Sequence, residues 1–325
     1  MIRRLIVVLI VGLATCPANA QQAEMSPQLS RHETQRGFPD KAELLRRIGL
    51  NEIAIQRLEA AHADSTGRVE VYLQLGRLYE DAGMYLKSED ALQRAVSLLE
   101  TGPQDRLAEA IGQLAGVHDL MGKLREAERE QLEALRISAR IGNPLGTARI
   151  WNDLADLYLK QRRYKMAAKY AQRAMDVLGN RSEVAPQDRI AVRQTLGFAL
   201  CRIRQCANAI RLLQDALELA KRHFGDDSLA VGAGYYLLGF ASWQNGNRSD
   251  AAEWMQRGTM RMKVDLGWGQ AIYVNAMRQY ARFLLEQGQF DASMAAESEV
   301  KQAEAVVDAR SITGRTGEVG AAVLR

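Results

Sequence analysis

The residues that most often carry out catalysis are few in this chain and stand far apart. Histidine occurs four times, as His32, His62, His118 and His223, and none lies close in sequence to a candidate nucleophile or metal ligand. The sequence has no H-E-x-x-H zinc motif, no G-x-S-x-G nucleophile motif and no glycine-rich phosphate loop before a lysine. His118 fits a packing position between helices better than a catalytic one. We therefore expect no enzymatic activity, no metal site and no cofactor.

Two cysteines could form a disulfide. Cys201 and Cys206 are the only thiols after the first twenty residues, and their C-x4-C spacing differs from the C-x-x-C spacing of redox catalysts. In an oxidising compartment such a pair is more often bridged than free. Residues on either side of a helical turn must, however, bring their Cα atoms within about 7 Å to be bridged. The sequence is therefore compatible with two states of these cysteines. They form a disulfide, or they are two small core residues that are not in contact.

The first twenty residues have the three parts of a secretory signal peptide. Arg3-Arg4 is basic, Leu5 to Thr15 is apolar, and Ala18-Asn19-Ala20 is a small-residue cleavage site. The apolar run is shorter than the roughly 20 residues that span a bilayer. We expect cleavage after Ala20 and a periplasmic or secreted protein of the Gram-negative type. Lipid attachment at Cys16, the one route to membrane association that we foresee, and an uncleaved anchor are the alternatives.

The overall composition resembles that of globular proteins. The chain has 325 residues, of which 47% are hydrophobic and 25% charged, which excludes a disordered chain, a collagen and a multi-span membrane protein. Removal of residues 1–20 takes two arginines with it and leaves 41 basic against 39 acidic residues. So small an excess gives no support for nucleic-acid binding, which needs a clustered basic face.

One pattern recurs six times between residues 68 and 308. A large residue is followed three positions later by a leucine or tyrosine, then by a small residue, and then by another residue three positions on. Small residues recur thirteen and twenty positions after the leucine, except that Val300 takes the second place in the sixth copy. The copies begin 39, 40, 42, 42 and 42 residues apart. The six copies are Tyr72-Leu75-Gly76-Tyr79, Ile111-Leu114-Ala115-His118, Trp151-Leu154-Ala155-Tyr158, Arg193-Leu196-Gly197-Leu200, Tyr235-Leu238-Gly239-Ser242 and Met277-Tyr280-Ala281-Leu284.

This pattern resembles the tetratricopeptide repeat, W-x2-L-G-x2-Y followed by two alanines. The resemblance implies an all-α, right-handed α-solenoid of antiparallel helix pairs over residues 38–308, with six clear repeats and one degenerate repeat in front. Repeats of about 42 residues with long linkers are similar to those of kinesin light chain and of bacterial scaffold proteins. The resemblance implies binding of a protein or peptide, and it brings no catalytic residue.

Polarity and glycine positions predict the structure of the remaining segments and of the turns inside the repeats. Residues 21–37 are polar and are expected to form a linker, and residues 309–325 lose the repeat pattern and are expected to form a flexible tail. Four of the six turns inside repeats have a glycine, which favours the left-handed conformation that ends a helix. Arg162 and Arg204 stand at the other two, and they suggest a different turn there.

The first helix of each repeat is implied to line a concave groove. Arginine and aromatic side chains are typical of binding hot spots, and amide side chains can pair with an extended peptide backbone of any sequence. The N-terminal half of this face is small and acidic, whereas the C-terminal half is aromatic. The predicted binding residues are Arg77, Gln113, Asn152, Asp156, Gln194, Phe198, Tyr236, Phe240, Trp243, Arg278 and Arg282.

The aromatic part of this face need not be a binding surface. An aromatic stripe at helical spacing is often core, and it could also reflect a tighter superhelix, a tail folded into the groove or a dimer surface. The sequence does not predict an oligomeric state.

Two functions fit these features. The first is a non-enzymatic scaffold that binds an extended peptide or protein segment in the groove. The alternative is a structural subunit of an envelope assembly for secretion, pilus formation or outer-membrane biogenesis, which docks through its convex face or its ends. A small-molecule cofactor and nucleic acid are not expected in either case.

The signal peptide gives a direct prediction. Mass analysis of the exported protein should find a first residue of Gln21, because the cleavage site ends at Ala20. A chain that begins at Cys16 with the added mass of lipid would contradict this and would place the protein on a membrane.

Overall fold

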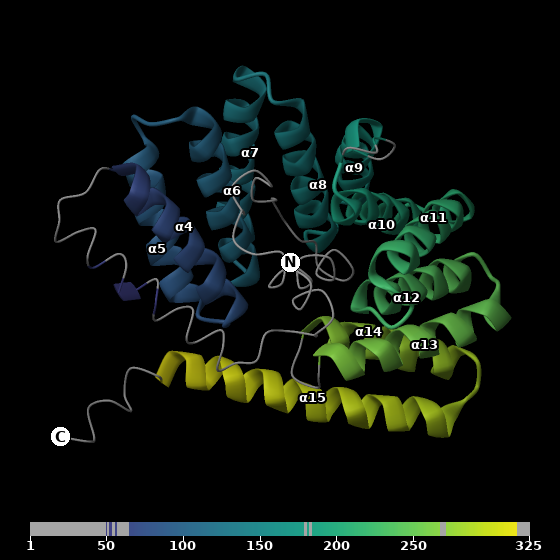
Figure 1. Cartoon of the computed structure of the whole chain (residues 1–325). Coiled ribbons are helices and arrows are strands. Elements are labelled where there is room, and N and C mark those ends of the chain that lie inside the picture. The colour runs from purple at the N-terminus through teal and green to yellow at the C-terminus, as the bar shows by residue number, and fades with distance from the viewer. Residues whose placement is uncertain are drawn as a thin grey trace, which may run out of the picture. The chain divides into compact units, whose positions relative to one another are not determined.

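The computed structural model describes residues 50, 52, 53 and 56, and then 65–178, 181, 184–266 and 271–316. These residues form helices and connecting turns without a strand (Figure 1). In the described part of the chain, none of the helices has the length and apolar character needed to cross a bilayer. The signal peptide, the linker, Cys16, most of the degenerate first repeat and residues 317–325 lie outside the described residues.

The helices follow one another in antiparallel pairs, each pair joined by a short turn. Their bounds are α4 Ser65–Asp81, α5 Tyr85–Leu99, α6 Gln104–Leu120, α7 Leu124–Arg140, α8 Pro144–Lys160, α9 Tyr164–Leu178, α10 Pro186–Arg202, α11 Cys206–Phe224, α12 Leu229–Gln244, α13 Arg248–Leu266, α14 Ala271–Glu286 and α15 Phe290–Thr316.

The described helices belong to two compact units. Helices α4 to α9 lie in the unit within Gly12–Arg181, and α10 to α15 lie in the unit within Ser182–Arg325. In each unit the second helix of a pair also packs against the first helix of the next pair, as α5 does on α6 and α11 on α12. The predicted all-α repeat solenoid is confirmed. The expected bounds of the array, residues 38–308, stay a prediction, and its described helices fall in these two units.

Small residues lie where the helices of a pair come closest. A Cβ atom on Gly76 would stand 2.6 Å from the side chain of Leu92, so an alanine there would force Leu92 to shift. Ser88 takes the alanine position of this repeat and donates its hydroxyl to the Gly76 carbonyl oxygen at 2.7 Å. Ser293 does the same for Ala281 at 2.9 Å. The serines therefore keep the close packing and add a hydrogen bond between the helices.

The closest approach is between α12 and α13. A Cβ atom on Gly258 would lie 2.5 Å from the backbone nitrogen of Tyr236, and one on Gly239 would lie 2.6 Å from the backbone nitrogen of Met255. Backbone atoms cannot turn aside as a flexible side chain can. These glycines lower helix propensity by about 1 kcal/mol each, but they allow the two helices to touch backbone to backbone.

The turns inside the repeats share one geometry. The glycines of four turns have positive φ, for example 76° at Gly122. Arg162 and Arg204 also have positive φ, of 59° and 66°. The backbone N–H of Arg163 donates to the Tyr158 carbonyl oxygen at 2.8 Å, the same bond that follows the glycine in the other turns. The expectation of a different turn at the two arginines is wrong. The end of the helix requires a residue in the left-handed conformation, and each arginine adopts it at a cost in backbone strain.

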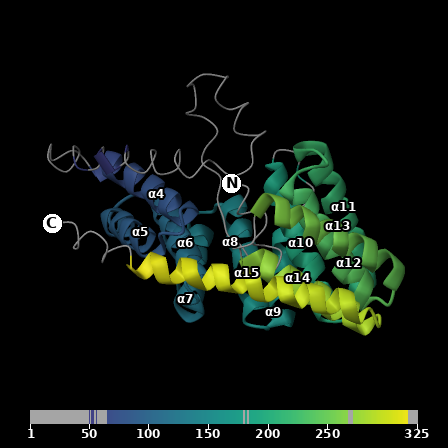
Figure 2. The same cartoon turned by 90° about the horizontal axis from the view of Figure 1, so that it is seen from below.

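Proline and serine residues mark the N-terminal ends of three helices. Helices α8 and α10 begin at Pro144 and Pro186, where a missing N–H costs nothing. Ser228 caps α12 by accepting the N–H of Val231. The last helix, α15, is long and continuous and runs to Thr316, eight residues beyond the expected end of the repeats at 308 (Figure 2).

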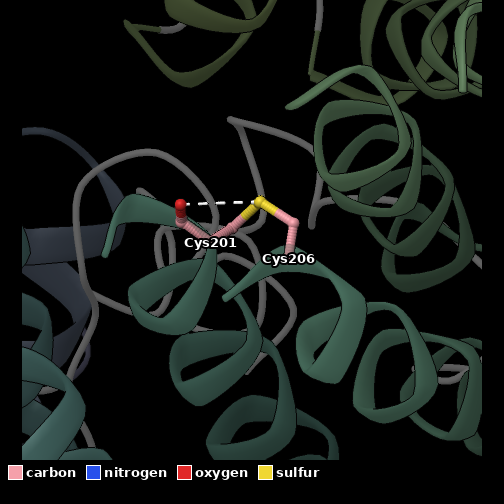
Figure 3. Close-up of a disulfide and its surroundings, with 2 residues drawn as sticks. All are labelled: Cys201 and Cys206. Carbon is pink, nitrogen blue, oxygen red and sulfur yellow. Dashed lines mark hydrogen bonds between the residues drawn. A yellow bond between two sulfur atoms is a disulfide. The ribbon is translucent and has the colours of Figure 1, made fainter. Parts of the chain in front are cut away.

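Cys201 and Cys206 form a disulfide across the turn between α10 and α11 (Figure 3). Their Cα atoms are 4.2 Å apart, and both side chains are buried. The bridge encloses Arg204, the strained residue of this turn. Of the two states that the sequence left open, the bridged one is therefore present.

The shared turn geometry predicts opposite effects for two exchanges in neighbouring repeats. Arg162→Gly should raise the free energy of unfolding by about 1 kcal/mol, because glycine adopts positive φ without the Cβ clash. Gly122→Ala should lower it by a similar amount, since open space around Gly122 leaves only the backbone cost. Urea unfolding of both variants checks the pair, and a destabilised Arg162→Gly would show that the arginine side chain contributes more than its backbone costs.

Candidate binding surface

A hydrogen-bonded chain on α4 and α6 fixes the amide of Gln113. Arg77 Nη2 donates to Glu109 Oε1 at 3.1 Å, and Gln113 Nε2 donates to the same oxygen at 3.1 Å. This arrangement sets the amide orientation, because the nitrogen must face the carboxylate. The Oε1 atom of Gln113 is buried and has no hydrogen-bond partner, and the residue is only 2% exposed.

A second unpaired acceptor lies on α8. Asn152 is 6% exposed, and its Oδ1 atom is buried without a hydrogen-bond partner. Asp156, which is buried, follows one turn later on the same face of the helix. A buried acceptor without a partner costs about 1–3 kcal/mol in the free protein.

An ion pair holds the ends of α6 and α8 together. Lys160 Nζ contacts Asp119 Oδ2, and the lysine side chain is buried. Burial lowers the pKa of Lys160 and raises the pKa of Asp119, although each charge favours the other. The second oxygen of Asp119, Oδ1, is buried and has no hydrogen-bond partner.

This ion pair sets the register of the two helices. Asn152, Asp156 and Lys160 lie on one face of α8 at four-residue intervals, and Gly112 and Asp119 lie on one face of α6. Since Asp119 meets Lys160, Gly112 lies about level with Asn152. Gly112 is buried, yet a Cβ atom built on it would meet nothing within 4 Å. Helix packing therefore does not require this glycine, unlike Gly76.

We name these residues the α6–α8 face. It consists of Gly112, Gln113, Asp119, Asn152 and Asp156. Three of them, Gln113, Asn152 and Asp156, were predicted as binding residues from the sequence. Lys160 and Glu109 were missed, and the signal for Lys160 was its place two turns beyond Asn152 on the predicted face.

The aromatic residues of the C-terminal unit form a packed series. The ring centroids of Phe198 and Phe240 are 5.2 Å apart, those of Phe240 and Trp243 are 6.0 Å apart, and those of Trp243 and Phe283 are 5.7 Å apart. The series joins α10, α12 and α14. Trp243 also donates its Nε1–H to Glu286 Oε2 at 3.0 Å.

The expectation that these aromatics face an open groove is wrong. Tyr236 and Phe240 are each 2% exposed and Trp243 is 8% exposed, while Phe198 is half-buried. Their register points toward the first helix of the neighbouring repeat, and large rings at that register fill the space between the two helices. The stripe is core in this unit, which is one of the alternatives that the sequence left open.

The remaining predicted residues are dispersed. Gln194 is fully buried in α10, with neither amide atom in a hydrogen bond. Arg278 and Arg282 are exposed and pair with Glu304 and Glu286. Binding of a ligand by these residues and by Arg77 stays a prediction.

His118 lies in the core of the N-terminal unit. Its Nδ1 is 2.7 Å from Glu130 Oε2 and its Nε2 is 2.8 Å from Glu89 Oε1, and Lys123 Nζ also donates to Glu89. Burial raises the pKa of Glu130, although the histidine opposes it. Two hydrogen bonds to carboxylates need a proton on both ring nitrogens or on one carboxyl group. This cluster joins α5, α6 and α7 as a structural element.

Other kinds of site are not apparent in the described part of the chain. There, no group of three or more histidine, cysteine, aspartate or glutamate side chains could hold a metal ion. A shallow hollow of about 360 Å³ lies on α4 and α5, and it contains none of the predicted binding residues.

Comparison with known families settles the repeat type. Models described as tetratricopeptide repeat match residues 69–98, 106–179 and 189–230. The chain is a tetratricopeptide repeat protein. These matches cover parts of both units, and the repeat supports a role as a protein–protein interaction scaffold. No curated protein sequence matches this tetratricopeptide repeat protein.

Solved structures share the fold of this tetratricopeptide repeat protein. BtubC from P. vanneervenii is 21% identical, with a TM-score of 0.56 over 69% of this chain and 92% of BtubC. The apo form of RapI is 16% identical, with a TM-score of 0.63 over 82% and 93% of the two chains. Aspartyl phosphate phosphatase F from Bacillus subtilis is 14% identical, with a TM-score of 0.66 over 81% and 67%. At these identities the likeness concerns the fold alone.

The aromatic series predicts which tryptophan stabilises the protein. Trp243→Ala should lower the free energy of unfolding by about 3–5 kcal/mol, because it removes a buried ring and leaves a cavity. Trp151→Ala should cost less, since Trp151 is half-buried and covered on one side by Arg173. Chemical unfolding measured by circular dichroism compares the two. A Trp243→Ala protein that unfolds like wild type would show that the ring is not part of the core.

Proposed function

We propose that this protein binds an extended segment of a partner protein on the α6–α8 face. The observation that carries the proposal is the pair of buried, unpaired carbonyl oxygens of Gln113 and Asn152. An extended polypeptide offers backbone N–H groups, which are the donors that such oxygens lack. Binding would satisfy both acceptors and recover the free energy that they cost in the free protein.

Gly112 supports the same proposal. A glycine inside a helix costs about 1 kcal/mol relative to alanine, and no neighbouring atom requires it here. Glycine is suited to places where the backbone of a ligand comes close to a helix. Gly112 lies level with Asn152, so both features serve one segment that passes over α6 and α8.

We also propose that the protein acts in the periplasm or outside the cell. The support is the three-part signal in residues 1–20 together with the Cys201–Cys206 disulfide. Disulfides persist in oxidising compartments, so the bridge and the signal agree.

A second candidate function is assembly through the end of the C-terminal unit. Leu285, Phe290 and Met294 are 48%, 62% and 61% exposed around the turn between α14 and α15. Exposed apolar side chains gathered at one place are typical of contact surfaces. This feature favours an envelope assembly subunit that docks through its end.

A peptide selection with matched variants separates the two functions. Random 12-residue peptides are selected on the mature chain and then measured against Gly112→Leu, Asn152→Ala and Met294→Glu. For a segment-binding scaffold, the first two variants should weaken binding by about tenfold or more, whereas Met294→Glu should leave it unchanged. Peptides that bind all variants equally, or none selected, would contradict the proposal. Loss of binding in Met294→Glu alone would favour the second function.

The face also predicts a stability effect that needs no ligand. Gly112→Ala should raise the free energy of unfolding by up to about 1 kcal/mol, because alanine favours the helix and meets no neighbour. Gly76→Ala is the matched control and should lower it, since its Cβ atom would stand 2.6 Å from Leu92. Thermal unfolding of the two variants checks this. Equal destabilisation would mean that Gly112 serves packing and not a ligand.

A further inference from the structure

The hollow of about 360 Å³ on α4 and α5 belongs to the N-terminal unit. Arg68 and Tyr72 line it from α4, and Asp90, Arg94 and Ser97 line it from α5. Sites for small organic molecules usually have volumes of about 300–1,000 Å³, so the hollow has room for a ligand of several carbon atoms. None of its lining residues belongs to the α6–α8 face.

Arg94 has partners within this lining. Its Nε atom is 3.1 Å from Asp90 Oδ2, and its Nη1 atom donates to the Tyr72 hydroxyl group at 3.4 Å. Its guanidinium group also lies 5.8 Å from the centre of the Tyr72 ring. These contacts hold Arg94 in place and pair the charge of Asp90.

Arg68 differs from Arg94 because its charge is not paired. In the described part of the chain, its guanidinium group has neither an ion pair nor a hydrogen bond. The residue is half-buried, and since Nε is its only buried nitrogen without a partner, the two Nη atoms are accessible to a ligand. Glu70, two positions along α4, is paired with Arg106. Two arginines and one aspartate therefore leave the lining with one positive charge in excess.

The rest of the lining provides neutral donors and an apolar wall. Gln93 and Ser97 are exposed on α5, and their side chains can donate hydrogen bonds. Leu98 is half-buried and Tyr72 is buried, so part of the lining is apolar. Apolar walls with a few polar groups that fix the orientation of the ligand are typical of small-molecule sites.

We propose that this hollow binds a carboxylate group on a short apolar chain, with the carboxylate on Arg68 and the chain against Leu98. The planar fork of a guanidinium group matches the two oxygens of a carboxylate. One carboxylate also brings one negative charge, which equals the excess of the lining. The site goes beyond the proposed function and does not depend on it.

Other charged groups fit this hollow less well. A phosphate group carries about −1.5 to −2 charges at pH 7, which exceeds the single positive charge in excess and adds repulsion from Asp90. An amine would meet two guanidinium groups and be repelled. A free organic acid and an acidic side chain of a partner protein both supply a carboxylate, and the experiment distinguishes these two sources.

Calorimetric titration of the mature chain tests the ligand class. Hexanoate is the probe for a free acid, and N-acetyl-glutamate amide is the probe for an acidic side chain. At least one of them should bind in the millimolar range, whereas hexylamine and inorganic phosphate should bind about tenfold more weakly or less. Tighter binding of hexanoate would identify a free acid as the ligand, and tighter binding of the glutamate derivative would identify a side chain of a partner.

Variants of the protein test the site. Arg68→Gln should weaken binding of the tighter probe by about tenfold, because a charge-assisted hydrogen bond is lost. Ser97→Trp keeps both arginines and should also weaken binding, since the larger side chain fills the hollow. Arg125→Gln is the matched control, because Arg125 is exposed on α7 outside the hollow, and it should bind like wild type. Melting temperatures check that all variants fold.

The outcomes are distinct from those of the proposed function. Absence of binding by both probes would overturn the inference, and so would equal binding by wild type and Arg68→Gln. Gly112→Leu should bind the carboxylate probe normally, because Gly112 does not line the hollow. A failure of the carboxylate site therefore leaves the α6–α8 proposal untouched, and the reverse is also true.

Discussion

Helix pairs in this protein meet at positions that have glycine, alanine or serine. Leu92 packs over Gly76, and the backbone of Tyr236 lies against Gly258. The helices can come this close because these glycines have no Cβ atom. The serines at two of the alanine positions strengthen the same contact with a hydrogen bond across it. This distance between the paired helices determines the rest of the packing. One face of each first helix is covered by its pair partner, and the other face contacts the next first helix or a ligand.

The two units use that remaining face in opposite ways. In the C-terminal unit, Phe240 and Trp243 fill it and pack against the neighbouring first helices. In the N-terminal unit, the corresponding register of α6 and α8 has Gly112, Asn152 and Asp156, which are too small or too polar to fill it. Among these residues, Asn152 has a buried Oδ1 atom without a hydrogen-bond partner, and helix packing does not need such an atom. One repeat pattern thus supports a packed aromatic core in one unit and a buried polar face in the other, which we propose as the recognition surface.

The sequence predicted the repeats because small and large residues recur at spacings that only helix pairs explain. It failed at Arg162, where the residue type suggested another turn although the backbone demand of the helix end prevailed. It failed for Tyr236 because a helical wheel gives the face of a residue but not whether a neighbouring helix covers that face. Lys160 escaped notice for a related reason: its ion pair with Asp119 joins residues 41 positions apart, and no local pattern reports it.

The Cys201–Cys206 bridge also bears on how the protein matures. Its cysteines are five residues apart within one helical hairpin, so they meet as soon as that hairpin forms, well before a unit is complete. After residue 20 the sequence contains no third cysteine that could form a wrong bridge. Within residues 21–325, oxidation therefore has a single intramolecular product, and it requires an oxidant but no isomerase to correct mispaired disulfides.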